Sequence, residues 1–160
     1  MKMKYPNFIN KILYLEDLRA IKNLKNDYAL GCDEVFCRGC PEPLLGLFTP
    51  DAVWDVGRFG RFEGVGSIKE CLEEIRESYV YSIHYFTNPR IDIQGYRAEG
   101  RWNLWALYTD VKEQDLILTG TEDDNYQKFQ NKWFIKEMRL DVHFQAPLFK
   151  GWHGLIGESL

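Results

Sequence analysis

Apolar residues recur every three or four positions between residues 15 and 36, and this spacing predicts the clearest helix of the chain. Lys25 falls outside the apolar stripe, whereas Asp33 falls at its edge, where a carboxylate is able to face the interior. Gly39 and Pro41 are expected to end the helix. The stripe consists of Leu15, Leu18, Ile21, Leu24, Tyr28, Cys32 and Val35.

Shorter elements are expected to follow this helix. They are a helix over 43–48, a strand over 52–56, a turn over 57–60, a return strand over 61–63 and a helix over 68–78. Ser67 is expected to cap the last of these helices, with Glu70 at the position that completes a capping box.

The second half of the chain has the pattern of a sheet. A strand rich in β-branched and aromatic residues covers 80–86, and Pro89 is expected to end its regular pairing. Three long strands over 98–110, 115–129 and 132–144 follow, and short polar turns separate them. Long neighbouring strands with short connections predict an antiparallel meander. The predicted fold class is α+β, with a curved antiparallel sheet packed on the N-terminal helices around an internal pocket.

Composition narrows the possible classes of protein. The chain has 160 residues, 45% of them hydrophobic and 15% aromatic, which predicts a single domain with a sizeable core and a tail over 147–160 that covers the pocket or an interface. A net charge of -4 provides no basic surface for nucleic acid, and no apolar run is long enough to span a membrane. Polar residues interrupt any signal-peptide core, so a cytoplasmic location is expected. Cys37 and Cys40 lack the second pair of ligands typical of a zinc site and are interpreted as plain thiols.

His84 is the first candidate for proton chemistry, because histidine titrates near neutral pH. A carboxylate that binds one ring nitrogen fixes the tautomer and raises the basicity of the other nitrogen. Asp33 supplies that carboxylate if the first helix packs across the strand of His84. The alternative is a core histidine bonded only to backbone. One inward histidine and no phosphate-binding glycine loop lead us to expect neither a metal nor a cofactor.

Several short motifs, taken in their order, resemble the SnoaL-like branch of the NTF2-like superfamily across most of the chain. They are Tyr28-Ala-Leu-Gly-Cys-Asp33, Leu47-Phe-Thr-Pro-Asp-Ala-Val-Trp54, Phe62-Glu-Gly64, Ile83-His-Tyr85, Thr87-Asn88, Gly100-Arg-Trp102 and the segment from Tyr126 through Trp133. The resemblance implies a cone-shaped α+β barrel with an internal pocket, and a homodimer or higher homo-oligomer.

Within that branch the chain is similar to three groups of lyases, which are hexachlorocyclohexane dehydrochlorinases, bile-acid 7α-dehydratases and scytalone dehydratases. This resemblance implies elimination without a cofactor from a small, largely apolar cyclic substrate. It implies His84 as the base, Asp33 as the acid that orients it, and Tyr28 as a pocket hydroxyl that assists the leaving group or a carbonyl.

The remaining pocket candidates follow from the same resemblance. Ala106 and Val142 stand where the bile-acid enzymes have an acid and an arginine, so this pocket is expected to be less polar. Glu122 stands where scytalone dehydratases have a pocket asparagine; it either faces the pocket as a second acid or lies in water with the acidic run 122–124. The predicted substrate-binding residues are Trp54, Trp102, Leu104, Ala106, Tyr108, Glu122 and Val142.

Two other functions fit the same pattern. One is an isomerase or cyclase that acts on a polyketide-type or terpenoid-type ring with the same pair of residues, since a fold does not choose between these reactions. The other is a ligand-binding protein without chemistry. A hydrogen bond between Asp33 and His84 beside an open cavity favours an enzyme, whereas a filled interior favours the last alternative.

Overall fold

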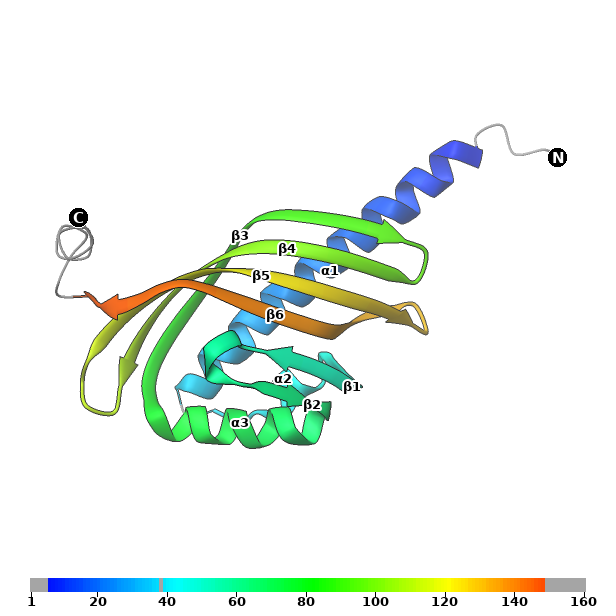
Figure 1. Ribbon diagram of the computed structural model, residues 1–160. Helices are drawn as coiled ribbons and strands as arrows, with labels where there is room; N and C mark the ends of the chain where they lie inside the picture. The colour runs from blue at the N-terminus through cyan, green and yellow to red at the C-terminus, as the bar shows by residue number, and fades with distance from the viewer. Residues whose placement is uncertain (1–5, 38, 149–160) are drawn as a thin grey trace.

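The computed structural model of the chain describes residues 6–37 and 39–148. Its helices and short strands come first and its four long strands come last, so the fold is α+β, as the sequence predicts (Figure 1). None of the helices in these residues is both long and apolar enough to cross a membrane. The elements are α1 (Pro6–Phe36), α2 (Glu42–Leu45), β1 (Phe48–Asp55), the 3-10 turn η1 (Gly57–Phe59), β2 (Arg61–Glu63), α3 (Gly64–Ser78), β3 (Tyr79–Gln94), β4 (Arg97–Asp110), β5 (Asp115–Phe129) and β6 (Lys132–Pro147).

The six strands form one sheet in the order β2-β1-β6-β5-β4-β3. β3 to β6 make the predicted antiparallel meander. β1, however, pairs in parallel with β6, so the sheet is mixed rather than purely antiparallel. β2 and β3 are its two edges, and the curved sheet therefore stays open and does not close into the expected barrel.

α1 begins at Pro6, well before the predicted start at residue 15. Its first half projects past the sheet (Figure 1), and Phe8, Ile9, Ile12 and Leu13 are exposed there. The predicted start was wrong because apolar periodicity reports only the part of a helix that packs on a core.

Pro89 does not end β3, which continues to Gln94. The register with β4 shifts between Thr87 and Arg90, and Asn88 adopts a φ of 51° at this irregularity. The local irregularity removes the proline from the regular ladder, so the strand bends and resumes pairing.

The short elements before β3 also differ from the prediction. β1 begins at Phe48, so the predicted helix over 43–48 is only the four residues of α2. Ser67 lies inside α3 and does not cap it; Glu63 is the N-cap residue and makes no side-chain capping bond. Gly64, at a φ of 79°, instead turns the chain directly from β2 into the helix.

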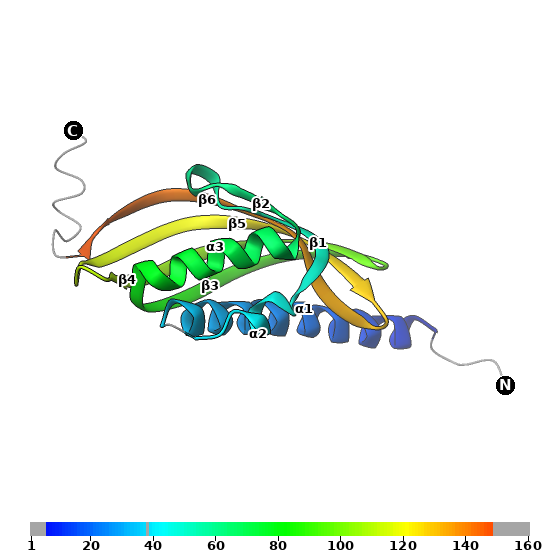
Figure 2. The same cartoon turned by 90° about the horizontal axis from the view of Figure 1, so that it is seen from below.

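α1 and α3 lie on one face of the sheet (Figure 2). The larger buried cluster joins α1, α2, α3, β1 and the start of β6, and residues such as Ile21, Ile68 and Ile135 are fully buried in it. Gly31 of α1 allows close packing of α2, because a Cβ atom there would lie 2.9 Å from Cδ1 of Leu44. A smaller cluster around Phe36 and Tyr108 fills the space beside β4 and β5.

Candidate active site

A partly open cavity of about 310 Å³ lies between the helices and the sheet. Its size is at the low end for small-molecule sites, which are about 300–1,000 Å³. Most of its wall is aromatic and aliphatic, with a few polar groups among them. The lining residues that matter below are Tyr28, Cys32, Phe36, Trp54, Cys71, His84, Phe86, Leu104, Tyr108 and Glu122.

His84 and Asp33 meet at this cavity because α1 packs against β3. Nδ1 of His84 lies 2.7 Å from Oδ1 of Asp33, and the two side chains are 8% and 22% exposed. Ser82, two residues before His84, donates a hydrogen bond of 3.3 Å from Oγ to the same oxygen. A carboxylate only accepts, so Nδ1 carries a proton, and in the neutral imidazole Nε2 then has the lone pair. The imidazole is therefore arranged as a base.

Aromatic rings fix the plane of the imidazole. Its centroid lies 5.3 Å from the ring of Phe36 and 5.5 Å from that of Tyr108, and both contacts are edge-to-face. Phe36 and Tyr108 themselves stack at 5.5 Å. Such packing leaves His84 few alternative rotamers, so the direction of Nε2 is set before a ligand arrives.

Tyr28 lines the same cavity one turn of α1 from Lys25. Its ring contacts Phe48 at 6.0 Å and Phe86 at 5.8 Å between centroids. Burial, and next the neighbouring Cys32 thiol, raise the pKa of Tyr28 well above its ordinary value. The phenol stays protonated at neutral pH, and its hydroxyl shares a side-chain hydrogen bond with Cys32.

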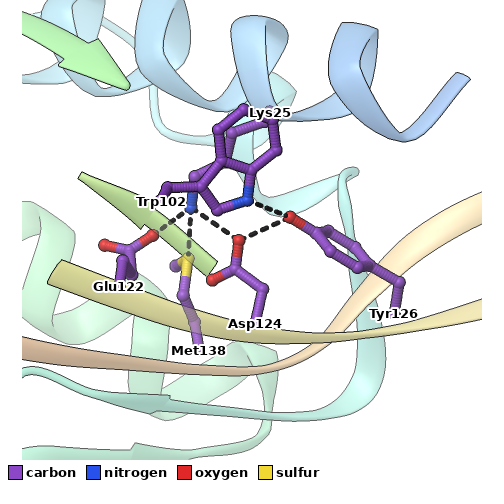
Figure 3. Close-up of polar contacts among 6 residues, drawn as sticks. All are labelled: Lys25, Trp102, Glu122, Asp124, Tyr126 and Met138. Carbon is purple, nitrogen blue, oxygen red and sulfur yellow. Dashed lines mark hydrogen bonds and ion pairs between the residues drawn. The ribbon is translucent and has the colours of Figure 1, made fainter. Parts of the chain in front are cut away.

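A buried polar cluster surrounds Lys25 (Figure 3). The ammonium of Lys25 donates to Oε1 of Glu122, to Oδ2 of Asp124 at 2.8 Å and to Sδ of Met138 at 3.6 Å. Tyr126 donates its hydroxyl proton to the same oxygen of Asp124, and Nε1 of Trp102 donates to the Tyr126 oxygen at 3.0 Å. Lys25 is 0% exposed, so α1 and β5 are joined by an ion-pair network without water access.

The cluster holds two carboxyl groups and one ammonium. Burial lowers the pKa of Lys25, but the charges of Asp124 and Glu122 outweigh it and leave that pKa raised. Burial, opposed by the charge of Lys25 and supported by that of Asp124, raises the pKa of Glu122 to about 7. Burial therefore favours the protonated form of Glu122, which belongs to both the cluster and the cavity wall.

The amino-acid sequence matches the SnoaL-like domain over residues 13–139. The chain belongs to the SnoaL-like domain family. No curated protein matches the chain significantly.

Solved structures share the fold of this SnoaL-like domain over nearly their whole length. Hexachlorocyclohexane dehydrochlorinase LinA type 2 superposes with a TM-score of 0.79 at 20% identity, over 86% of this chain and 93% of that one. A scytalone dehydratase-like protein of Novosphingobium aromaticivorans gives a TM-score of 0.76 at 26% identity, over 84% of this chain and 89% of that one. An NTF2-like superfamily protein of Salmonella enterica gives a TM-score of 0.69 at 17% identity, over 84% of this chain and 96% of that one. The first and third of these demonstrate the fold alone.

The structure of the SnoaL-like domain brings most of the predicted site residues together. His84, Tyr28, Trp54, Leu104, Tyr108 and Glu122 line the cavity, and Asp33 lies behind His84. Ala106 and Val142 instead pack in the smaller core cluster, and Trp102 belongs to the Lys25 network. Residues 149–160 of the predicted tail lie outside the described part of the chain.

Sequence reasoning missed Lys25 and Asp124. Lys25 lies four residues after Ile21 and three before Tyr28, so its spacing does fit the apolar stripe, although lysine is rarely buried. The acidic run did contain a usable signal, since strand alternation points Glu122 and Asp124 to one face and Asp123 to the other. Asp123 indeed pairs with Arg101 on the outer face, through two contacts of 2.6 Å.

The four cysteines of the SnoaL-like domain are free thiols. Cys32 and Cys71 line the cavity, and burial raises their pKa values to about 12 and about 11. They stay protonated at neutral pH and are poor nucleophiles. Among the described residues, no group of three or more His, Cys, Asp or Glu side chains is arranged to bind a metal ion.

Proposed function

We propose that this protein is a cofactor-independent lyase that removes a proton from a carbon atom of a small, largely apolar cyclic substrate. The observation that carries the proposal is the 2.7 Å contact between His84 and Asp33 at the wall of an apolar cavity. With Nδ1 bound to Asp33, Nε2 of His84 is the atom that takes the proton, and the carboxylate stabilises the imidazolium that forms.

Tyr28 is the group that assists the leaving atom or an adjacent carbonyl in this proposal. Its hydroxyl keeps its proton because burial raises its pKa, so it donates a hydrogen bond at neutral pH. The apolar wall excludes water and thereby strengthens each of these polar contacts. The names of two solved relatives, a dehydrochlorinase and a scytalone dehydratase-like protein, agree with elimination chemistry.

The test is an elimination assay with cyclic ketones that carry a hydroxyl or a chloride at the β-carbon. We expect wild-type protein to release water or halide, and His84→Ala or Asp33→Asn to lower kcat by about 10²–10⁴-fold with the fold retained. His143→Ala is the matched control, because His143 is exposed on the far face of β6.

Retention of wild-type activity in both variants would overturn the proposal. The mass of the product distinguishes the second candidate reaction from the first. Loss of water or halide supports the lyase, whereas a product of unchanged mass supports an isomerase or cyclase that uses the same pair.

The expected homo-oligomer and the cytoplasmic location belong to the same proposal. An aromatic patch on the outer face of β3 and β4 supports self-association, since exposed apolar patches commonly mark interfaces. Tyr85 and Trp105 pair across these strands and are exposed, and Tyr81 extends the row. The patch is defined as Tyr81, Ile83, Tyr85, Trp105 and Leu107.

A further inference from the structure

Donors and acceptors can be assigned to each hydrogen bond of the Lys25 cluster. The indole N–H of Trp102 is only a donor, so the oxygen of Tyr126 accepts there and its own proton points to Asp124. Oδ2 of Asp124 thus accepts from Tyr126 and from Lys25. Its other oxygen, Oδ1, is buried with no hydrogen-bond partner among the described residues. Two donors therefore converge on one oxygen of Asp124, which is the arrangement expected of a carboxylate.

The surroundings of Glu122, unlike those of Asp124, favour a neutral carboxyl group. The charge of Lys25 balances one carboxylate, and Asp124 already provides it, so a second ionised carboxylate would leave an uncompensated buried charge. Oε1 of Glu122 accepts from Lys25, which is the role of the carbonyl oxygen of a carboxylic acid. The second oxygen turns away from the cluster (Figure 3). Glu122 is also the cluster member that lines the cavity.

We propose that Glu122 is a neutral carboxylic acid that donates a hydrogen bond to the ligand, so that the cavity selects an apolar ring carrying a carbonyl or hydroxyl oxygen. Lys25 acts as a positioning residue, because it holds Oε1 and leaves the acidic proton on the oxygen that turns away. The wall also contains Trp54, whose buried Nε1 has no partner among the described residues. The Glu122 proton and the Trp54 indole N–H are both donors, so they suit a ligand oxygen that accepts hydrogen bonds better than they suit a cation.

This inference deepens the proposed function, and only its catalytic consequence rests on that function. When His84 takes a proton from carbon, the electrons of the C–H bond move to a carbonyl oxygen, either directly or through a conjugated double bond. Glu122 would stabilise the negative charge on that oxygen and keep its own proton. No oxidant, reductant or cofactor is needed for this step.

The experiment measures binding and not turnover, so it remains informative even where elimination is not found. Three bicyclic probes of similar shape are titrated by calorimetry, namely 1-tetralone as an acceptor, tetralin as a hydrocarbon and 1-aminotetralin as a cation. We expect 1-tetralone to bind most tightly at pH 6 and to lose about tenfold in affinity by pH 8, as Glu122 ionises with a pKa of about 7. The affinity for tetralin should not change with pH.

Glu122→Gln keeps the shape and an oxygen for Lys25, and it should abolish the pH dependence of 1-tetralone binding. The other titratable groups facing Glu122 are Lys25, Tyr28 and Cys32 on α1, Tyr108 on β4, and Asp124 and Tyr126 on its own strand. The tyrosines and the thiol do not ionise between pH 6 and 8, because burial raises their pKa values. Each titration is repeated in a His84→Gln background to remove the imidazole.

Infrared spectroscopy provides a direct readout of the proton. Wild-type protein at pH 6 should show the C=O band of a protonated carboxylic acid, and that band should be missing in Glu122→Gln. Preferential binding of 1-aminotetralin, or 1-tetralone affinity that is equal in wild type and Glu122→Gln at every pH, would overturn the proposal. Loss of elimination in His84→Ala concerns the proposed function and leaves this result unaffected.

Discussion

Asp33 shares one oxygen between two donors, Nδ1 of His84 at 2.7 Å and Oγ of Ser82 at 3.3 Å. The serine hydroxyl stabilises the charged form of the carboxylate and fixes its orientation under the imidazole. Ser82 is buried, so water cannot replace it readily. It is a positioning residue, since it acts on His84 through Asp33.

We therefore predict that Ser82→Ala lowers kcat by about five- to tenfold, which corresponds to one hydrogen bond of about 1 kcal/mol. The loss should appear in kcat and not in KM, because Ser82 acts on His84 through Asp33. An unchanged kcat would show that Ser82 only fills space.

Glu122 makes a second prediction at the level of one residue. Burial raises its folded pKa to about 7 from an ordinary value of 4.5, so the folded state binds the proton more tightly than the unfolded state does. The contribution of this group to stability is then greatest below pH 4.5 and falls as the pH rises toward 7, by at most about 3 kcal/mol. Urea unfolding at pH 5 and pH 8 should reveal a decline in wild-type stability that Glu122→Gln lacks.

Single residues were the least predictable part of the chain. Asp33 and His84 could be paired from their types and from a family resemblance, because both chemistry and order along the chain identify them. Lys25 could not, since its burial depends on two carboxylates far away in sequence on β5. A helix pattern contains no information about such distant partners.

At the level of elements, α1 and β5 are joined by the ammonium of Lys25. Removing it leaves two buried carboxyl groups facing an apolar side chain. We predict that Lys25→Met lowers the free energy of unfolding by about 3–5 kcal/mol at pH 8. The loss should be smaller at pH 5, where Glu122 holds its proton and one buried negative charge remains in place of two.

Lys22→Met is the control for this prediction, because Lys22 is exposed on the same helix. Chemical denaturation of both variants at the two pH values checks the result. Equal losses in the two lysine variants would mean that the buried ion pairs contribute nothing beyond helix propensity.

The long antiparallel strands were predictable, since their turns are short and polar and their pairing is local. The parallel pairing of β1 with β6 was not predictable, because it joins segments far apart in sequence and no short turn connects them. Pro89 misled the prediction for a related reason. A bulge at Thr87 to Arg90 accommodates it, and bulges leave little trace in hydrophobic alternation.

At the level of the whole molecule, the two faces of the sheet differ. One face carries α1, α3 and the cavity, and the other presents the aromatic patch of β3 and β4. The layered arrangement followed from the sequence pattern. The order of side chains along the cavity did not, because it depends on the curvature of the open sheet.

We predict that the wild type is an oligomer and that Tyr85→Ser with Trp105→Ser shifts it to a monomer, because the patch loses its two largest exposed rings. Size-exclusion chromatography with light scattering checks this over a range of concentrations. Tyr96→Ser is the matched control, since Tyr96 is 73% exposed in the turn between β3 and β4. A monomeric wild type, or a double variant that associates normally, would contradict the prediction.

The length and stiffness of α1 have one more consequence. Lys25 and Asp33 lie roughly 12 Å apart along its axis, at about 1.5 Å per residue. The helix therefore acts as a rigid spacer between Asp33, which contacts the proposed base His84, and Lys25, which contacts the proposed hydrogen-bond donor Glu122. Motion of the sheet therefore shifts His84 or Glu122 relative to a helix that stays rigid. One inserted residue between the anchors would rotate them by about 100° relative to each other, so that Lys25 and Asp33 could no longer both keep their partners.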